Sequence, residues 1–201
     1  MSPTVTSIIG LCAQPQHGKT TAQRFLEMLG VTPVDDSEPL RRATMERYGL
    51  SWDDVSTQQG KASLVARPDY GDIVPVRQAI GDLGKEYESE HGPNYWVERA
   101  IASLAPGSLV SFGSVRMTQG RAIKMAGGVV FALSDPRRPS SPYDFDQFDE
   151  SVVDRWIIND GSLWDLERRV TEAGCSVLGL DFAAIWKERQ QDALIASMVH
   201  A

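Results

Sequence analysis

One stretch near the start of the chain limits the fold more than any other. Residues 8–21 read IIGLCAQPQHGKTT. The apolar run from Thr4 to Cys12 predicts a buried strand, and the apolar residues after the loop recur with helical spacing, at positions 22, 25, 26 and 29. Between them, Ala13–Thr20 fits the phosphate-loop pattern G-x-x-x-x-G-K-[ST], with alanine in place of the first glycine. A strand, such a loop and a helix in this order predict an α/β fold with the loop at the strand's carboxyl end.

The chemistry of this loop favours a bound phosphate. The first amides of a helix have no partner inside the helix, and the helix dipole adds to their attraction for an anion. Gly18 allows close approach of the backbone, Lys19 can reach the β- and γ-phosphates, and the Thr20 hydroxyl can hold Mg²⁺. We therefore expect an ATP-binding loop made of Ala13, Gln14, Gln16, His17, Gly18, Lys19, Thr20 and Thr21. His17 receives no separate catalytic role.

The rest of the chain alternates between strand and helix patterns. Strands are expected near residues 31–36, 108–114, 129–133 and 154–160. Helices are expected near residues 37–50, 75–90, 94–104, 116–128 and 162–174, with a last amphipathic helix from about residue 181. This alternation predicts a three-layer α/β/α fold around a parallel sheet of about five strands. We expect a single domain over 1–201, with a substrate-binding excursion at about 51–75 and a lid-like loop at about 134–148.

Charge and cysteine content narrow the possible partners and location. Lys plus Arg number 20 and Asp plus Glu number 27, so the net charge of −7 disfavours nucleic acid as a partner. No apolar segment approaches the length of a membrane span, so no membrane partner is expected. Cys12 and Cys175 have no disulfide-framework spacing. Together these features favour a cytoplasmic protein with reduced thiols.

The loop indicates a nucleotide but not the reaction. Neither a guanine-specific N-K-x-D signature nor an apolar strand ending in a Walker B aspartate is apparent. The chain is also short for a motor protein. Small phosphoryl-transfer enzymes remain, in which arginine side chains hold a second phosphorylated substrate. The candidate arginines follow strands or begin helices at the expected ligand edge: Arg41, Arg77, Arg116, Arg137 and Arg138.

From about Ile8 to about Val170, the sequence resembles the bacteriophage deoxynucleoside monophosphate kinase family. Four stretches carry the likeness beyond the opening loop. The segment DDSEPLRRATMERYGL resembles the family's acid-Pro-Leu segment and following helix, and VRQAIGDLGKEYESEHGPNYWVERAI resembles its Arg-led helix, Leu-Gly step and later tryptophan. GSVRMTQGRAIKMAGGVVFAL resembles its Val-Arg turn, helix, Gly-Gly and strand, and DESVVDRWIINDGSLWDLERRV its closing strand, Asn-Asp-Gly turn and helix.

The resemblance implies an enzyme that transfers the γ-phosphoryl group of ATP to a deoxynucleoside monophosphate, with Mg²⁺, in the cytoplasm of an infected host and as a possible homodimer. It implies that Lys19, Arg77 and Arg116 are catalytic and that Arg137 or Arg138 contacts ATP as a lid residue. Thr20 and Asp36 are the implied magnesium ligands. The substrate-binding set is Asp36, Glu38, Arg41, Arg77, Trp96 and Arg116. Trp96, however, lies on the apolar stripe of its helix, which favours a place in the core.

Three departures from the family pattern leave alternatives open. Ser114 and Gly120 stand where the family usually has Asp and Glu, and Gly81 stands where it often has Gln. Asp36 could replace the missing carboxylate, or phosphates, Thr20 and water could hold the ion, or activity could be reduced. The rivals are a kinase that acts on a hydroxyl of DNA or a nucleoside, with Asp36 positioning that hydroxyl, and a nucleotide-binding protein without catalysis. The preferred base and sugar are not determined.

Overall fold

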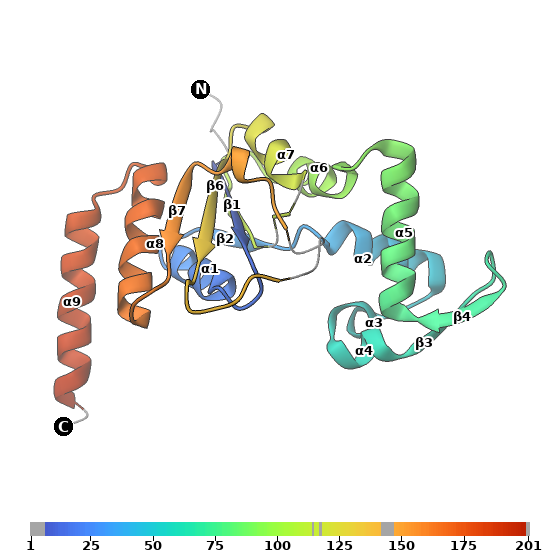
Figure 1. The fold of residues 1–201 in the computed structure, drawn as a ribbon, viewed down its shortest axis with the longest axis horizontal. Coiled ribbons are helices and arrows are strands. Elements are labelled where there is room, and N and C mark those ends of the chain that lie inside the picture. Colours follow the sequence, from blue (N-terminus) through green and yellow to red (C-terminus); the bar gives the residue numbers. More distant parts are fainter. Residues whose placement is uncertain (1–6, 114, 117, 142–146, 200–201) are drawn as a thin grey trace. The chain divides into compact units, whose positions relative to one another are not determined.

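The computed structural model describes residues 7–113, 115–116, 118–141 and 147–199 (Figure 1). The chain divides into two compact units, each described by itself below. The first consists of the residues up to Val34 together with those from Ala105 onward, and the second is Asp35–Leu104. The second unit is therefore inserted between the second and the third strand of the first unit.

The first unit is built on a five-stranded sheet. Its strands are β1 (Ser7–Ala13), β2 (Thr32–Val34), β5 (Leu109–Phe112), β6 (Val129–Ser134) and β7 (Arg155–Ile158). They lie in the order β2-β5-β1-β6-β7, and every pairing is parallel. In the central strand, Gly10 is opposite Phe112 on one side and Val130 on the other. The predicted parallel sheet of about five strands is confirmed.

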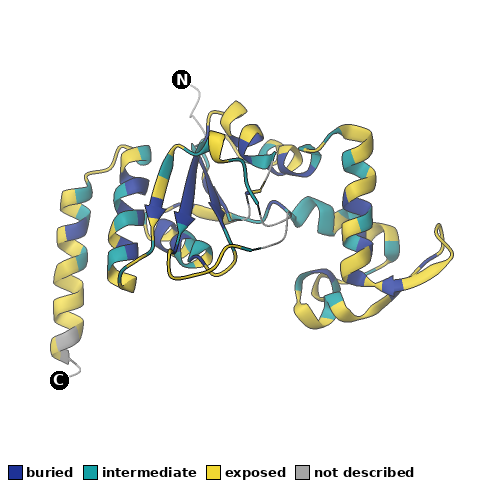
Figure 2. Ribbon diagram, in the orientation of Figure 1, coloured by how far each residue is buried: buried dark blue, intermediate teal, exposed yellow. Residues whose placement is uncertain are grey.

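Helices cover both faces of this sheet, which gives the predicted three layers. The helical elements of the first unit are α1 (Lys19–Glu27), α7 (Gln119–Met125), α8 (Leu163–Leu178), α9 (Phe182–Val199) and the 3₁₀ turn η2 (Glu150–Val152). On one face, Ile9 and Leu11 of β1 share a buried cluster with Leu26 of α1 and Val170 of α8 (Figure 2). On the other face α7 approaches β1 so closely that a Cβ on Gly10 would lie 2.9 Å from Ile123 Cδ1.

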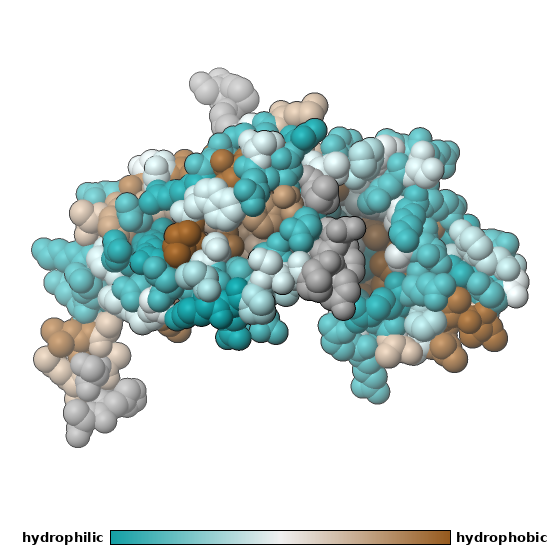
Figure 3. Space-filling model, viewed as in Figure 1, coloured by the Kyte–Doolittle hydropathy of each residue, from teal (hydrophilic) through white to brown (hydrophobic). Residues whose placement is uncertain are grey.

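The last helix differs from its predicted amphipathic character. Trp186 of α9 is buried, and its ring centroid lies 4.6 Å from that of Trp164 on α8. Farther along, the apolar side chains of Leu194, Ile195 and Met198 are exposed, and apolar atoms are visible on the surface of this end of α9 (Figure 3). Among the described residues, no helix combines the length and apolar character needed to cross a membrane.

The second unit is mainly helical and has its own core. Its elements are α2 (Glu38–Tyr48), α3 (Trp52–Ser56), α4 (Gln58–Ala62), the antiparallel pair β3 (Leu64–Arg67) and β4 (Asp72–Pro75), α5 (Val76–His91) and α6 (Tyr95–Ala102). The core of this unit includes Val55, Val65, Val74, Val76 and Ala79. The stretch 51–75 therefore contributes buried valines to a folded unit, although its polar sequence favours a surface excursion.

Close backbone packing joins the two short helices of this unit. A Cβ on Gly60 of α4 would lie 2.2 Å from the carbonyl oxygen of Asp53 and 2.5 Å from Cα of Asp54, both in α3. Contacts this short with backbone atoms cannot be relieved by turning a side chain. Glycine is therefore needed at position 60 so that α4 can lie against α3.

We predict that Gly60→Ala lowers the free energy of unfolding by roughly 1–3 kcal/mol, the usual effect of overpacking. Gly81→Ala is the matched control, because a Cβ on the exposed Gly81 of α5 meets nothing within 4 Å. That variant should be neutral or slightly stabilising, since alanine favours a helix. Urea titrations compare the two variants, and equal stabilities would contradict the close packing of α3 and α4.

Candidate functional site

The loop between β1 and α1 has the backbone conformation that its sequence pattern requires. Gly18 is the N-cap of α1 and lies in the left-handed region, with φ 101° and ψ 9°. Gln16 also has a positive φ, 65°, and the His17 amide donates to the Gln14 carbonyl at 3.3 Å to close the turn. Ala13 is the last residue of β1 and is buried. A strand residue needs no left-handed conformation, so alanine fits where the motif has its first glycine.

The start of α1 is suited to an anion. Within the described part of the chain no side chain caps this end, and the first turn contains no acidic residue. The Ala22 amide donates to the Gly18 carbonyl at 2.9 Å, so the amides before Ala22 precede the first bond of the helical ladder. Lys19 is the first helical residue and Thr20, the second, is exposed. Backbone dipoles and one ammonium group thus gather at the carboxyl end of the central strand.

Cys12, just before this loop, is not a reactive thiol. It is fully buried in β1, and burial raises the pKa of its thiol to about 12, although the nearby Lys19 ammonium acts in the opposite direction. The thiol therefore stays protonated at neutral pH and packs as a small apolar group.

His17 connects the loop to the end of β6. It is only 5% exposed, and its Nδ1 accepts a hydrogen bond from the Asp135 amide at 3.0 Å. A neutral imidazole that accepts at Nδ1 carries its proton on Nε2. The sequence gives His17 no catalytic role, and this contact gives it a role in supporting the loop.

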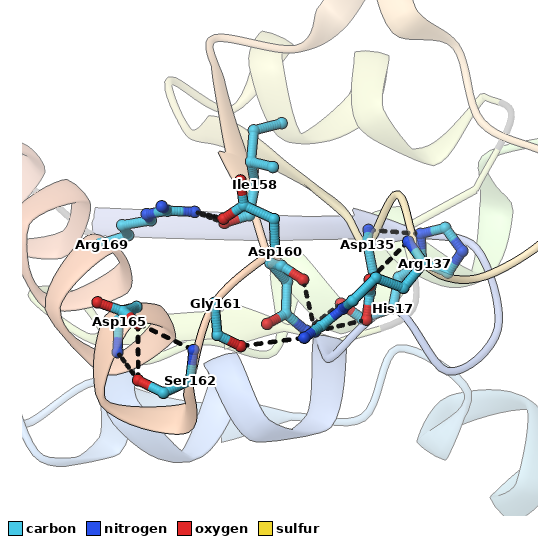
Figure 4. A network of polar contacts seen from close by, with 10 residues as sticks. His17, Asp135, Arg137, Ile158, Asp160, Gly161, Ser162, Asp165 and Arg169 are labelled. Atoms are coloured by element: carbon cyan, nitrogen blue, oxygen red, sulfur yellow. Dashed lines mark hydrogen bonds and ion pairs between the residues drawn. The ribbon is translucent and has the colours of Figure 1, made fainter.

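Arg137 joins the ends of β6 and β7 beside the loop (Figure 4). Its Nε and Nη2 donate to the two Asp135 carboxylate oxygens at 2.8 and 3.0 Å. It also donates to the carbonyls of Asn159 at 2.8 Å and Gly161 at 3.1 Å, after β7. The Asn159 side-chain amide in turn donates to the His17 carbonyl at 3.3 Å. The loop, the end of β6 and the end of β7 thus form one connected network.

The described parts of the expected lid-like loop also contact the phosphate-loop segment. Gln14 Oε1 accepts from the Ser141 amide at 3.0 Å, and Gln14 Nε2 donates to Gln147 Oε1 at 3.1 Å. Arg138 is exposed, and its amide donates to the Asp135 carbonyl at 3.0 Å. Residues 142–146 of this loop lie outside the described residues. The contact of Arg137 or Arg138 with ATP stays a prediction.

In the second unit, the structure brings together two of the predicted arginines. Arg41 forms an ion pair with Asp35, and Arg77 Nη2 donates to Gln58 Oε1 at 2.5 Å. Lys61 lies within electrostatic reach of both. Burial lowers the pKa of Lys61, and Arg41 and Arg77 lower it further, against the opposite effect of Asp35. The sequence did not identify Lys61, because nothing in the polar stretch 51–75 shows that α4 packs against α5.

The aromatic side chains of the second unit have different environments. Trp96 is only 6% exposed and packs against Tyr87, with 5.1 Å between ring centroids, and its Nε1 donates to the Gly84 carbonyl at 3.4 Å. This is the core position that its apolar stripe favours. Trp52 is exposed, and the Arg41 guanidinium carbon lies 6.0 Å from its ring centroid. The indole that is open to solvent therefore lies beside the basic residues.

The other predicted residues are more scattered. Glu38 pairs with Arg42 one turn along α2 at 2.6 Å, and Asp36 is buried. The backbone amide of the exposed Arg116 donates to Gln119 Oε1 at 2.9 Å. Ser114 lies outside the described residues. Among the described residues, no group of three or more His, Cys, Asp or Glu side chains could hold a metal ion.

Comparison with models of protein families gives no match, and comparison with curated proteins gives none either. Solved structures with a similar chain trace include a shikimate kinase from Bacteroides thetaiotaomicron, at 15% identity and TM-score 0.38, over 87% of this chain and 99% of that one. Another is a dephospho-CoA kinase from Campylobacter jejuni, at 10% identity and TM-score 0.42, over 86% of this chain and 98% of that one. Likenesses this distant decide neither substrate nor reaction.

We predict that Arg137 controls the acid titration of Asp135. The Arg137 hydrogen bond is the largest cause that lowers the pKa of this carboxyl, to about 2, from an ordinary value of about 3.9 in an unfolded chain. Because the folded pKa is the lower one, the stabilisation is complete above pH about 4 and is lost as the pH falls towards 2. In Arg137→Gln the pKa of Asp135 should rise. The parent and the variant should therefore differ in free energy of unfolding above pH about 4, and this difference should shrink as the pH falls towards 2.

The titration can be followed by carbon NMR of the Asp135 carboxyl and the stability by urea titration at several pH values. Arg138→Gln is the matched control, because Arg138 has the smallest effect on the pKa of Asp135 among the groups that shift it. If Arg137→Gln left the titration midpoint of Asp135 where it is in the parent, this assignment would be wrong.

Proposed function

We propose that the protein is an ATP-dependent phosphotransferase that converts a deoxynucleoside 5′-monophosphate to the diphosphate. The observation that carries this proposal is the left-handed Gly18 at the start of α1, directly before Lys19, at the carboxyl end of the central strand. This geometry presents amides and an ammonium group to a polyphosphate. The basic residues of the second unit support an anionic acceptor, and the resemblance to the phage family supports the deoxynucleotide.

The roles proposed for the side chains follow from their chemistry. Residues Ala13–Thr21 hold the phosphates of ATP, and Lys19 neutralises the transferring group. Arg137 and Arg138 contribute to ATP binding from the 134–148 loop. Arg41, Arg77 and Arg116 hold phosphate groups, with Arg77 on the acceptor, and Asp36 and Glu38 face the nucleoside. A homodimer and a cytoplasmic location remain predictions.

Magnesium fits the phosphate loop in one respect. Thr20 is exposed in the first turn of α1, so its hydroxyl is open to an ion that accompanies ATP. Mg²⁺ keeps several water ligands and commonly binds through substrate phosphates, so it does not need a cage of carboxylates. We propose Thr20 as its protein contact, and the other implied ligand, Asp36, stays a prediction. When bound, the ion would neutralise charge on the β- and γ-phosphates.

In this reaction the side chains have mainly to position two anions and to neutralise charge. A monophosphate acceptor already carries its nucleophilic oxygen as an anion, so the chain needs no strong general base. The helix-start amides and Lys19 hold the donor, and the arginines offset the repulsion between donor and acceptor. In the transition state, negative charge lies on the equatorial oxygens of the transferring group. These contacts therefore stabilise the transition state by neutralising that charge.

We predict that Lys19→Ala lowers kcat for phosphoryl transfer by at least about 100-fold, as expected when a preorganised charge donor is removed. The fold should be retained, because Lys19 is not part of the apolar core. Lys187→Ala in α9 is the control. Activity is measured by ADP release, and circular dichroism reports the fold. Near-normal turnover in the variant would contradict the assignment of the phosphate loop.

We further predict that ADP release with ATP and magnesium depends on a deoxynucleoside monophosphate. The panel includes the four common deoxynucleoside monophosphates, the matching nucleosides and hydroxymethylated DNA. Faster release with a nucleoside or DNA would instead favour a hydroxyl-acceptor kinase. Tight ATP binding with no acceptor-dependent release would favour a nucleotide-binding protein without catalysis.

A further inference from the structure

Two arginines of the second unit act electrostatically on Lys61, and the three cations come from three different helices. Arg41 is on α2, Lys61 on α4 and Arg77 in the first turn of α5. The Arg77–Gln58 hydrogen bond of 2.5 Å joins the start of α5 to α4. Gln58 and Lys61 are three residues apart on α4, so their side chains are neighbours on one face of that helix. The bond to Gln58 therefore brings Arg77 towards Lys61.

The negative charge near this cluster is smaller than the positive charge. Asp35 pairs with Arg41, and its other carboxylate oxygen accepts from the Ser37 amide at 2.9 Å. In the described part of the chain, the side-chain partner of Arg77 is the neutral amide of Gln58, and Lys61 forms no ion pair with a carboxylate. Three cations against one carboxylate leave a local charge of about +2, although the whole chain carries −7.

Partial burial makes this excess charge costly. The Arg41 side chain is only 19% exposed. Burial is the largest cause that lowers the pKa of Lys61, and the two guanidinium groups lower it further against the opposite effect of Asp35, so the surroundings disfavour the charged ammonium. An anion bound among the three cations would offset this effect, and phosphate oxygens accept hydrogen bonds from guanidinium and ammonium groups alike.

We infer that Lys61 is the third cation of a phosphate site shared with Arg41 and Arg77, and that it makes the site selective for a doubly charged phosphomonoester. Such a group carries a charge between −1.5 and −2 at neutral pH, which matches the local excess. A nucleoside hydroxyl would leave the local excess of about +2 uncompensated. This inference rests on the proposed function, because it identifies what distinguishes the acceptor of that reaction.

Trp52 offers a local signal for the site. Its ring centroid lies 6.0 Å from the Arg41 guanidinium carbon and 5.9 Å from that of Arg42. A phosphate that draws Arg41 away from Asp35 should change the surroundings of this exposed indole and therefore its fluorescence. Because the chain has five tryptophans, Trp52→Phe shows which part of a change comes from this position.

The first test is steady-state kinetics on the full chain with saturating ATP and varied deoxynucleoside monophosphate. Lys61→Met keeps most of the apolar stem and removes the charge. We expect it to raise KM for the monophosphate at least tenfold, with kcat changed by no more than about twofold, and Lys61→Arg to restore KM. Lys85→Ala, an exposed lysine of α5, is the control. A KM unchanged in Lys61→Met overturns the inference.

The second test needs no catalysis, so it separates this inference from the proposed function. Inorganic phosphate, and then a deoxynucleoside monophosphate, is titrated without ATP while Trp52 fluorescence is recorded. We expect a saturable change that is absent in Trp52→Phe and at least tenfold weaker in affinity in Lys61→Met. If no monophosphate supports turnover but this binding pattern holds, the proposed reaction is wrong and the phosphate site stands. Equal affinities in the parent and Lys61→Met overturn the site even if turnover is normal.

Discussion

The backbone at Gly18 has to reverse direction between the central strand and α1 while leaving its amides open. A φ of 101° does this, and only glycine adopts it without strain. The absence of a side chain matters as well, because a Cβ on Gly18 would lie 2.8 Å from Nδ2, the side-chain amide nitrogen of Asn159. The Asn159 side chain can therefore reach the His17 carbonyl, while Arg137 separately holds the chain after β7 against Asp135. The contact between the loop and the chain after β7 therefore depends on this one small residue.

The two units offer anions different kinds of contact. At Gly18 most donors are backbone amides, fixed in direction by the start of a helix, and only Lys19 adds a full charge. In the second unit the donors are side chains of three different helices, whose positions depend on how α2, α4 and α5 pack. Amides fixed in direction distinguish anions by their shape, whereas clustered cations distinguish them by their charge.

Periodicity was sufficient to predict the parallel sheet, because β1 and β6 are long, apolar and followed by turn residues. It also favoured a core position for Trp96. It did not reveal the core of the second unit, since Val55, Val65 and Val74 are widely spaced in a polar stretch and meet only after two short helices and a hairpin have formed. For the same reason Lys61 was missed. The partners of Arg137 were equally hidden, because Asn159 and Gly161 become its neighbours only through the pairing of β6 with β7.

Gly120 shows why a departure from a family pattern has to be judged by its surroundings. The resembling family usually has glutamate there. In this chain position 120 is buried, and a Cβ would lie 2.6 Å from Val152 Cγ2 in the η2 turn. A longer side chain could not enter without displacing that turn, so glycine here serves the packing of α7 against η2. An ion held chiefly by phosphates, water and the Thr20 hydroxyl does not require a carboxylate at this position. Glycine at position 120 therefore carries no argument against phosphoryl transfer, because packing alone explains why a larger side chain is absent.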